Sequence, residues 1–397
     1  MSLEKTASGE RVHISFFGRR NAGKSSLVNA VTGQKLAVVS NVAGTTTDPV
    51  KKAMELLPVG PVVITDTPGF DDEGELGLLR VGKTREILAG TDVAIFVKDS
   101  TSEPDETESE FYKLIQKKNI PCIKVNTKAD LISEIPPKAE NEIWVSAEKN
   151  INITELKDMI GSLASKSKPD KKIVADLLCE GDCVVLVTPI DESAPKGRLI
   201  LPQQQTIRDI LDFNCSAVVC QPAQLPSVLE SLSPKMVITD SQAFGKVSEL
   251  VPDNIPLTSF SILFARYKGD LATQVKGASM LSKLCDGDRI LISEGCTHHR
   301  QCGDIGTVKL PAWIKKFSKA DITFDFTSGG EFPSDLSAYK LVVHCGGCML
   351  NEAEMKHRIS TAVSAGVPIV NYGVAIAHIN GILKRSLELF PDVAELL

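Results

Sequence analysis

Three cysteines and two histidines in the last third of the chain form the pattern richest in chemistry. They occur as Cys296-x-His298 and as His344-Cys345-Gly346-Gly347-Cys348. Thiolates and imidazoles are ligands for soft metals, and three thiolates plus one further ligand suit either zinc or an iron–sulfur cluster. Their spacing alone leaves both metals open.

The three thiols are the ligands that this pattern favours most. Cys345 and Cys348 flank two glycines, which let the chain wrap round a metal, whereas inert core cysteines lie in apolar runs. Cys296 is the third expected thiolate ligand. The fourth position is open to three candidates, which are His298, His344 and Asp304. Cys302 is a further thiol that would close the site if it were a ligand.

A second pattern lies near the start of the chain. The apolar run Val12–Phe17 leads into Gly18–Ser25, which reads G-x4-G-K-S and opens a helix. Backbone N–H groups of such a loop surround phosphates, Lys24 neutralises the outer phosphates and the Ser25 hydroxyl ligates magnesium. The expected nucleotide-binding residues of this loop are Asn21, Ala22, Gly23, Lys24, Ser25 and Ser26.

Further nucleotide motifs follow in the required order. Asp66-Thr67-Pro68-Gly69 follows a strand, so that Asp66 can hold magnesium through water and the Gly69 N–H can sense the γ-phosphate. Thr127-Lys128-Ala129-Asp130 ends another strand, and the Asp130 carboxylate accepts two N–H bonds that guanine offers and adenine does not. Ser146 and Ala147 complete the guanine site, the latter through its N–H. This ordered set predicts a GTPase rather than an isolated glycine-rich turn.

The first domain resembles the translation-factor-related GTPases, especially the branch of the tRNA-modifying GTPase TrmE. Gly44–Asp48 resembles the first switch of that branch, which makes Thr46 the expected magnesium ligand. Phe70 stands where Ras-like enzymes place a water-orienting glutamine, and Asn21 stands where the branch uses an asparagine to hold potassium. Asn21 could instead bond its own backbone. The catalytic residues implied are Lys24, Thr46, Asp66 and Gly69, with slow hydrolysis activated by potassium.

These residues require αβ elements to position them. Residues 1–165 alternate apolar runs with amphipathic stretches, which predicts a P-loop GTPase domain with a parallel sheet. The charged segment 166–172 indicates a linker. Two smaller α/β domains are expected at 173–262 and 263–397. The second should hold a helix over 267–285 and strands at 289–292, 322–326, 341–343 and 369–370. Both cysteine segments follow such strands, so they should meet at one sheet edge.

Composition narrows the class of protein. The chain has 397 residues, a net charge of −6 and a pI near 5.7, which argues against a nucleic-acid-binding surface. No run is long and apolar enough for a membrane span, so a cytoplasmic protein is expected. There, ten cysteines suggest metal binding or buried thiols before disulfides.

Residues 173–262 contain no expected catalytic group. Short β-branched runs at 183–187, 217–220 and 236–239 alternate with helical stretches, and the cysteines among them suit buried apolar positions. Since a small sheet with an exposed edge pairs readily with a second copy, this domain is expected to form a homodimer.

The whole chain resembles HydF, the family of maturation GTPases of FeFe-hydrogenase. Its pattern C-x-H, a gap, then H-C-x-x-C is matched at Cys296, His298 and 344–348, and the loop 195–203 and the domain order are also similar. Cys302 falls outside that pattern, which makes it a bystander thiol. The resemblance implies a 4Fe–4S cluster and a transient diiron precursor delivered to apo FeFe-hydrogenase. The radical enzymes HydE and HydG would be further partners.

Two other functions compete with this scaffold and carrier. One is a zinc-stabilised RNA-modification GTPase, suggested by the first domain and disfavoured by the acidic balance. The other is a redox-sensing GTPase in which loss of the cluster gates hydrolysis. Brown colour after anaerobic purification would exclude zinc.

Overall fold

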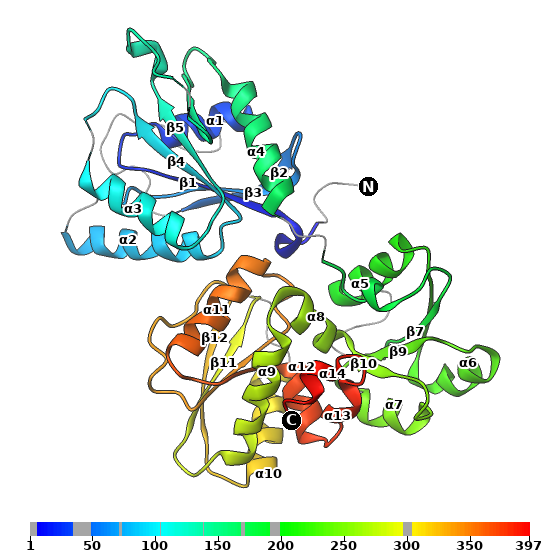
Figure 1. Cartoon of the computed structure of the whole chain (residues 1–397). Coiled ribbons are helices and arrows are strands. Elements are labelled where there is room, and N and C mark those ends of the chain that lie inside the picture. The colour runs from blue at the N-terminus through cyan, green and yellow to red at the C-terminus, as the bar shows by residue number, and fades with distance from the viewer. Residues whose placement is uncertain are drawn as a thin grey trace. The chain divides into compact units, whose positions relative to one another are not determined.

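The computed structural model describes residues 6–34, 49–70, 74–103, 105–137, 139–167, 171–190, 199–296 and 304–397. Thr46, His298, Cys302 and residues 195–198 of the loop expected at 195–203 lie outside these ranges. The chain divides into two compact units, Met1–Asp170 and Lys171–Leu397 (Figure 1). The described residues include no helix that combines the length and apolarity of a membrane span.

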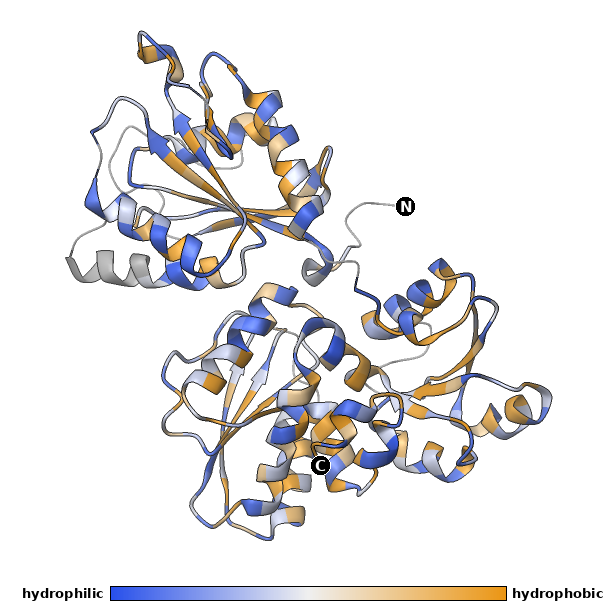
Figure 2. Ribbon diagram, viewed as in Figure 1, coloured by the Kyte–Doolittle hydropathy of each residue, from blue (hydrophilic) through white to orange (hydrophobic). Residues whose placement is uncertain are grey.

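The first unit contains a sheet whose described strands run in the order β2-β3-β1-β4-β5-β6. The strands are β1 (Val12–Phe17), β2 (Val50–Leu56), β3 (Gly60–Asp66), β4 (Val93–Asp99), β5 (Cys122–Thr127) and β6 (Glu142–Trp144). The helices are α1 (Lys24–Thr32), α2 (Gly74–Ala89), α3 (Glu106–Lys117) and α4 (Ile153–Ser167). The central strands consist mostly of hydrophobic residues, whereas α3 consists mostly of hydrophilic ones (Figure 2).

The predicted parallel sheet is confirmed for five of these strands, and β2 is the exception. It pairs antiparallel with β3 at the edge of the sheet. The first half of β2 is exposed, so its sequence lacks the apolar run by which the buried strands were recognised.

The second unit contains two parallel sheets, in the orders β10-β9-β7-β8 and β12-β11-β13-β14. The first has β7 (Cys183–Val187), β8 (Ser216–Cys220), β9 (Met236–Thr239) and β10 (Leu257–Ser259), with α5 (Leu201–Asp212), α6 (Leu225–Ser231) and α7 (Phe244–Leu250). The second has β11 (Arg289–Glu294), β12 (Thr323–Ser328), β13 (Leu341–His344) and β14 (Ile369–Asn371). The other helices of the second unit are α8 (Phe260–Lys268), α9 (Leu271–Ala278), α10 (Leu310–Ser318), α11 (Glu352–Ser364), α12 (Tyr372–Ile379), α13 (Leu383–Ser386) and α14 (Pro391–Ala394).

The predicted continuous helix over residues 267–285 is wrong. The chain instead forms α8, α9 and the short 3-10 helix η6 (Ser279–Lys283). Gly269 leaves the helical conformation, and the Asp270 carboxylate then caps α9 by accepting a hydrogen bond from the Thr273 N–H at 3.0 Å. Asp270 is a residue type that often caps helices, but it lies within a stretch where apolar residues recur at helical spacing without a break.

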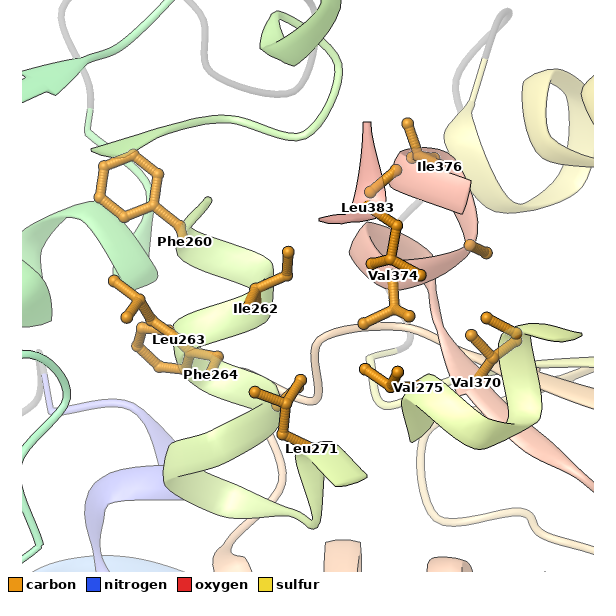
Figure 3. Close-up of a cluster of buried hydrophobic side chains, with 14 of the residues drawn as sticks. Phe260, Ile262, Leu263, Phe264, Leu271, Val275, Val370, Val374, Ile376 and Leu383 are labelled. Atoms are coloured by element: carbon orange, nitrogen blue, oxygen red, sulfur yellow. The ribbon is translucent and has the colours of Figure 1, made fainter. Parts of the chain in front are cut away.

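The two sheets of the second unit share one hydrophobic core. Side chains from β7 and from β13, such as Val184 and Val343, belong to the same buried cluster. Figure 3 shows part of this cluster, with side chains from α8, α9, β14, α12 and α13. The expected boundary between residues 262 and 263 falls within α8. Helix α8 therefore fixes the two sheets to each other.

Candidate functional site

The phosphate loop lies between β1 and α1, at the carboxyl edge of the first sheet. Lys24 is buried, and its Nζ donates hydrogen bonds to the carbonyl oxygens of Gly18 at 2.9 Å and Arg19 at 2.7 Å. Gly23 has a φ of 86°, a conformation that favours glycine. This arrangement places a cation within a loop suited to phosphate.

Ser25, in the first turn of α1, and Asp66, at the end of β3, meet at that edge. The Ser25 hydroxyl donates to Asp66 Oδ2 at 2.7 Å. Asp66 Oδ1 is buried and has no hydrogen-bond partner within the described residues. Burial raises the pKa of the Asp66 carboxyl, while Ser25 and Lys24 oppose that shift. A hydroxyl beside a carboxylate with an unused oxygen fits a magnesium ion, which prefers oxygen ligands.

The guanine motif is tied to the phosphate loop. The Thr127 hydroxyl donates to the Ala22 carbonyl oxygen at 2.7 Å, so the end of β5 is fixed to the loop after β1. The Ala129 N–H donates to the Val145 carbonyl at 3.0 Å. A hydrogen bond from Ser146 lowers the pKa of the Asp130 carboxyl, which therefore stays ionised. Asp130 and Ser146 thus lie together, where the Asp130 carboxylate can accept two guanine N–H bonds.

Phe70 packs into the interior and does not replace a water-orienting side chain. It is buried, and its ring stacks on Phe111 with ring centroids 4.5 Å apart and on Phe96 at 6.1 Å. A hydrocarbon ring in this cluster neither donates nor accepts a hydrogen bond from attacking water. Thr46, the expected magnesium ligand of the first switch, lies outside the described residues.

Two of the three expected cysteine ligands follow adjacent strands of the last sheet. Cys296 comes two residues after β11 and Cys345 comes directly after β13, and these strands are parallel neighbours with Ser293 opposite His344. The Cys345 N–H donates to the Ser293 carbonyl at 3.0 Å. The cysteine segments therefore reach the same sheet edge, as the rule for parallel αβ sheets requires.

The Cys345 sulfur accepts two backbone hydrogen bonds. The Gly295 N–H lies 3.0 Å from Sγ and the Gly347 N–H lies 3.4 Å from it. Burial raises the pKa of the Cys345 thiol to about 11, so a thiolate there needs a cation beside it. Gly347 has a φ of 62°, and a Cβ would lie 2.4 Å from the Met355 sulfur, so glycine is favoured at this position. N–H donors aimed at sulfur suit a metal-bound thiolate.

His344 is held by protein groups at both ring nitrogens. Nδ1 lies 2.7 Å from the Cys345 carbonyl oxygen, and Nε2 lies 3.1 Å from a guanidinium nitrogen of Arg358. Since a guanidinium only donates, Nε2 accepts this bond and Nδ1 carries the proton. Burial and the charge of Arg358 lower the pKa of His344 to about 3. For His344 to bind a metal, Nε2 would have to leave Arg358.

Arg358 joins the strand ends beneath the cysteine site. It is fully buried and also donates to Glu354 at 2.8 Å and to the Gly329 carbonyl at 2.7 Å. A contact of 3.3 Å with the Ser293 hydroxyl connects it to β11. Sequence reasoning missed this role, although Glu354 and Arg358 stand four residues apart on a helix, a spacing typical of an ion pair.

Asp304, the third candidate for the fourth position, has a capping role. Its Oδ2 accepts bonds from the N–H and hydroxyl of Thr307 at 2.9 and 3.0 Å, at the start of the π-helix η7 (Ile305–Lys309). Glu294, which sequence reasoning missed, is buried at the end of β11 and accepts a bond from the Tyr372 hydroxyl at 3.3 Å. Its position two residues before Cys296 is the feature of the sequence that could have identified Glu294 as part of the site.

Within the described ranges, no three His, Cys, Asp or Glu side chains converge closely enough to hold a metal ion. The segment 297–303, which includes His298 and Cys302, lies outside those ranges. The predicted ligand set of Cys296, Cys345 and Cys348 therefore stays a prediction. The structure does bring the end of β11, the end of β13 and the Cys345–Cys348 loop together.

Three family models match successive parts of the chain. The model described as 50S ribosome-binding GTPase matches residues 13–128. The hydrogen maturase F dimerization domain matches 173–269, and the hydrogen maturase F tetramerization domain matches 272–389. The last two together account for more than half of the chain.

Curated GTPases match part of the chain. The tRNA modification GTPase MnmE of Endomicrobium trichonymphae is 38% identical over 170 residues, which cover 40% of this chain and 37% of that protein. MnmE of Francisella philomiragia subsp. philomiragia is 35% identical over 159 residues, covering 38% of this chain and 35% of the relative. The chain thus spans little more than a third of the length of these relatives.

Among solved structures, a variant of Aquifex aeolicus Era bound to GDP and aluminium fluoride is 20% identical. The match covers 53% of this chain and 93% of the Era chain, with a TM-score of 0.35. The sheet order and the nucleotide motifs described above give the first unit a P-loop GTPase fold, in agreement with its family model. With both maturase domains following that GTPase domain, the chain belongs to the hydrogen maturase F family.

Proposed function

We propose that the chain is a GTP-hydrolysing scaffold that binds a 4Fe–4S cluster and carries the diiron precursor of the FeFe-hydrogenase active site. The single observation that supports this most is the Cys345 sulfur with two N–H donors, at a sheet edge that it shares with the Cys296 segment. The family's hydrogenase-maturation domains and the GTPase domain agree with it. The apo-hydrogenase would receive the diiron cargo, and HydE and HydG would supply it.

The residues that would hold each group follow from the sites described above. Ser25 and Asp66, joined by Thr46, would hold magnesium, and Lys24 would neutralise the phosphates. Cys296, Cys345 and Cys348 would hold the cluster, which supplies an iron open to exchange when a fourth protein thiolate is missing. Of the fourth-position candidates, His298 is favoured because His344 and Asp304 have other partners.

Activation of the apo-hydrogenase tests this function. The purified apo-hydrogenase would be incubated with the chain after coexpression of the chain with HydE and HydG, and hydrogen evolution would be measured. Activity that appears only with the chain supports a carrier. If the chain holds iron and sulfide but never activates the hydrogenase, the carrier function is wrong and a redox-sensing GTPase would be favoured.

GTP hydrolysis is expected to be slow and potassium-dependent. Asn21 is exposed on the phosphate loop, and no hydrogen-bonding side chain stands at Phe70. A positive φ of 62° gives Asn21 a second, purely conformational explanation. Turnover in equimolar potassium and sodium decides between them: we expect at least about tenfold faster hydrolysis in potassium, a difference of about 1.4 kcal/mol in barrier. Equal rates would favour the conformational explanation.

The homodimer is expected to form through the edge strand β8. This strand ends its sheet, and Val219 is exposed on it. Edge strands with apolar residues pair readily, and a lysine at such an edge opposes pairing. Val219→Lys should therefore increase the monomer fraction in sedimentation experiments on the full chain. Leu57→Lys, at a more exposed site in the first unit, is the control. An unchanged dimer in Val219→Lys would place the interface elsewhere.

A further inference from the structure

The loop that carries Cys348 is held by one buried lysine. Lys268, the last residue of α8, directs its Nζ at three carbonyl oxygens of the loop after β13. The distances are 3.4 Å to Gly347, 3.1 Å to Cys348 and 2.9 Å to Leu350. Residues 345–351 form neither helix nor strand, so their carbonyl groups need partners other than those of a helix or sheet. The Leu350 N–H is one of them, and it donates to the Gly347 carbonyl oxygen at 3.0 Å. Lys268 supplies three of these partners at once.

The amine reaches the loop from a rigid support. Ile262, Phe264 and Ala265 of α8 are buried in the core shared by the two sheets, which Figure 3 shows in part. The end of α8 is closed by the hydrogen bond from the Gly269 N–H to the Ala265 carbonyl at 3.1 Å. Because the helix is anchored along its length, the position of the Lys268 stem determines where the cysteine loop lies.

The same contact aligns the loop with the Cys296 segment. Leu350, which accepts the shortest of the three bonds, packs against Gly295, where a Cβ would meet the Leu350 side chain at 2.7 Å. Gly295 is also the donor to the Cys345 sulfur and directly precedes Cys296. Lys268 therefore holds a segment that touches both cysteine-bearing strand ends.

A charged amine is an unusual group with which to hold a loop in place when it is buried. Lys268 is only 3% exposed, and burying an ammonium group costs far more than burying a neutral donor such as an amide. A lysine in the last turn of a helix also interacts favourably with the helix dipole. However, the three bonds go to the loop and not to the carbonyl groups of α8. The charge of Lys268 therefore lies at the loop that carries Cys345 and Cys348, two of the expected thiolate ligands.

We propose that Lys268 is a positioning residue of the cysteine site, which orders the Cys345–Leu350 loop and offsets negative charge on a cluster bound there. Only the second role, the offset of negative charge on a bound cluster, rests on the proposed function. A cluster held by thiolates is negatively charged and becomes more so on reduction, so a nearby cation favours the reduced form and raises the potential. Ordering of the loop does not depend on any metal.

Two variants, each followed by two measurements, test these effects. Lys268→Met keeps the length of the stem but removes the charge and the donors, whereas Lys268→Arg keeps both. Lys276→Met on α9, where the lysine is exposed, is the matched control. Hydrogen exchange of the 345–350 amides would be followed in the metal-free chain. The iron content and reduction potential would be measured after anaerobic reconstitution with iron and sulfide.

We expect faster exchange in Lys268→Met, with either a more negative potential or a loss of iron that Lys268→Arg restores. Parent-like exchange and potential in a folded Lys268→Met would overturn the inference, and so would equal loss of iron in both variants. If the parent chain binds no iron, the proposed cluster is wrong, yet the exchange comparison still tests the ordering role of Lys268. A chain that binds no cluster can therefore be told apart from a chain in which Lys268 does not order the loop.

Discussion

Replacing Cys345 by serine is expected to lower the iron content of the reconstituted chain by more than about tenfold, with GTP hydrolysis unchanged. The Cys345 sulfur accepts two backbone N–H bonds, so its loss removes a ligand that is already oriented at the strand edge. The GTPase residues belong to the other compact unit of the chain and do not depend on this loop. Iron and sulfide analysis together with the rate of phosphate release would check both statements.

Other cysteines provide the controls for this experiment. Cys285→Ser changes an exposed thiol outside the loop and should bind iron like the parent. Cys296→Ser and Cys348→Ser should behave like Cys345→Ser, whereas Cys302→Ser should not. Loss of the cluster in Cys302→Ser would instead indicate a closed site with four thiolates, for which electron storage is a better function than cargo transfer.

Replacing Lys24 by alanine is expected to weaken GTP binding by at least about a hundredfold. The Nζ of this buried lysine lies over the phosphate loop, and two hydrogen bonds between a cation and phosphate oxygens contribute about 3–6 kcal/mol. Titration with a fluorescent GTP analogue would measure the change. The variant should still bind iron, because the cysteine edge belongs to the other unit.

Lys113→Ala, an exposed lysine of α3, is the matched control and should bind GTP normally. A Lys24→Ala variant that binds GTP like the parent would mean that the phosphates lie elsewhere. One that loses both GTP and iron would show that the two units are not independent.

The fold was predictable wherever burial imposes a pattern on the sequence. Strands such as β7 and β9, buried on both faces, read as continuous β-branched runs and were located closely. The short strand β10 and the exposed edge strand β2 carry no such run and were missed. The break between α8 and α9 was missed because the apolar period continues across Gly269, although the chain conformation changes there.

The nucleotide site was easier to predict than the cysteine site. Its residues stand in contiguous motifs at strand ends, so their order alone specifies the chemistry. The groups that shape the cysteine site are scattered: Lys268, Glu294 and Arg358 come from three different elements and meet only in the folded chain. For the same reason His344, adjacent to a cysteine in sequence, resembled a ligand although Arg358 occupies its Nε2.

The metal content of the anaerobically purified chain, measured together with acid-labile sulfide, decides whether the chain holds a 4Fe–4S cluster. We expect about four iron and four sulfide per chain, brown colour and an EPR signal after reduction. Stoichiometric zinc without sulfide, in a colourless protein that still hydrolyses GTP, would contradict this expectation.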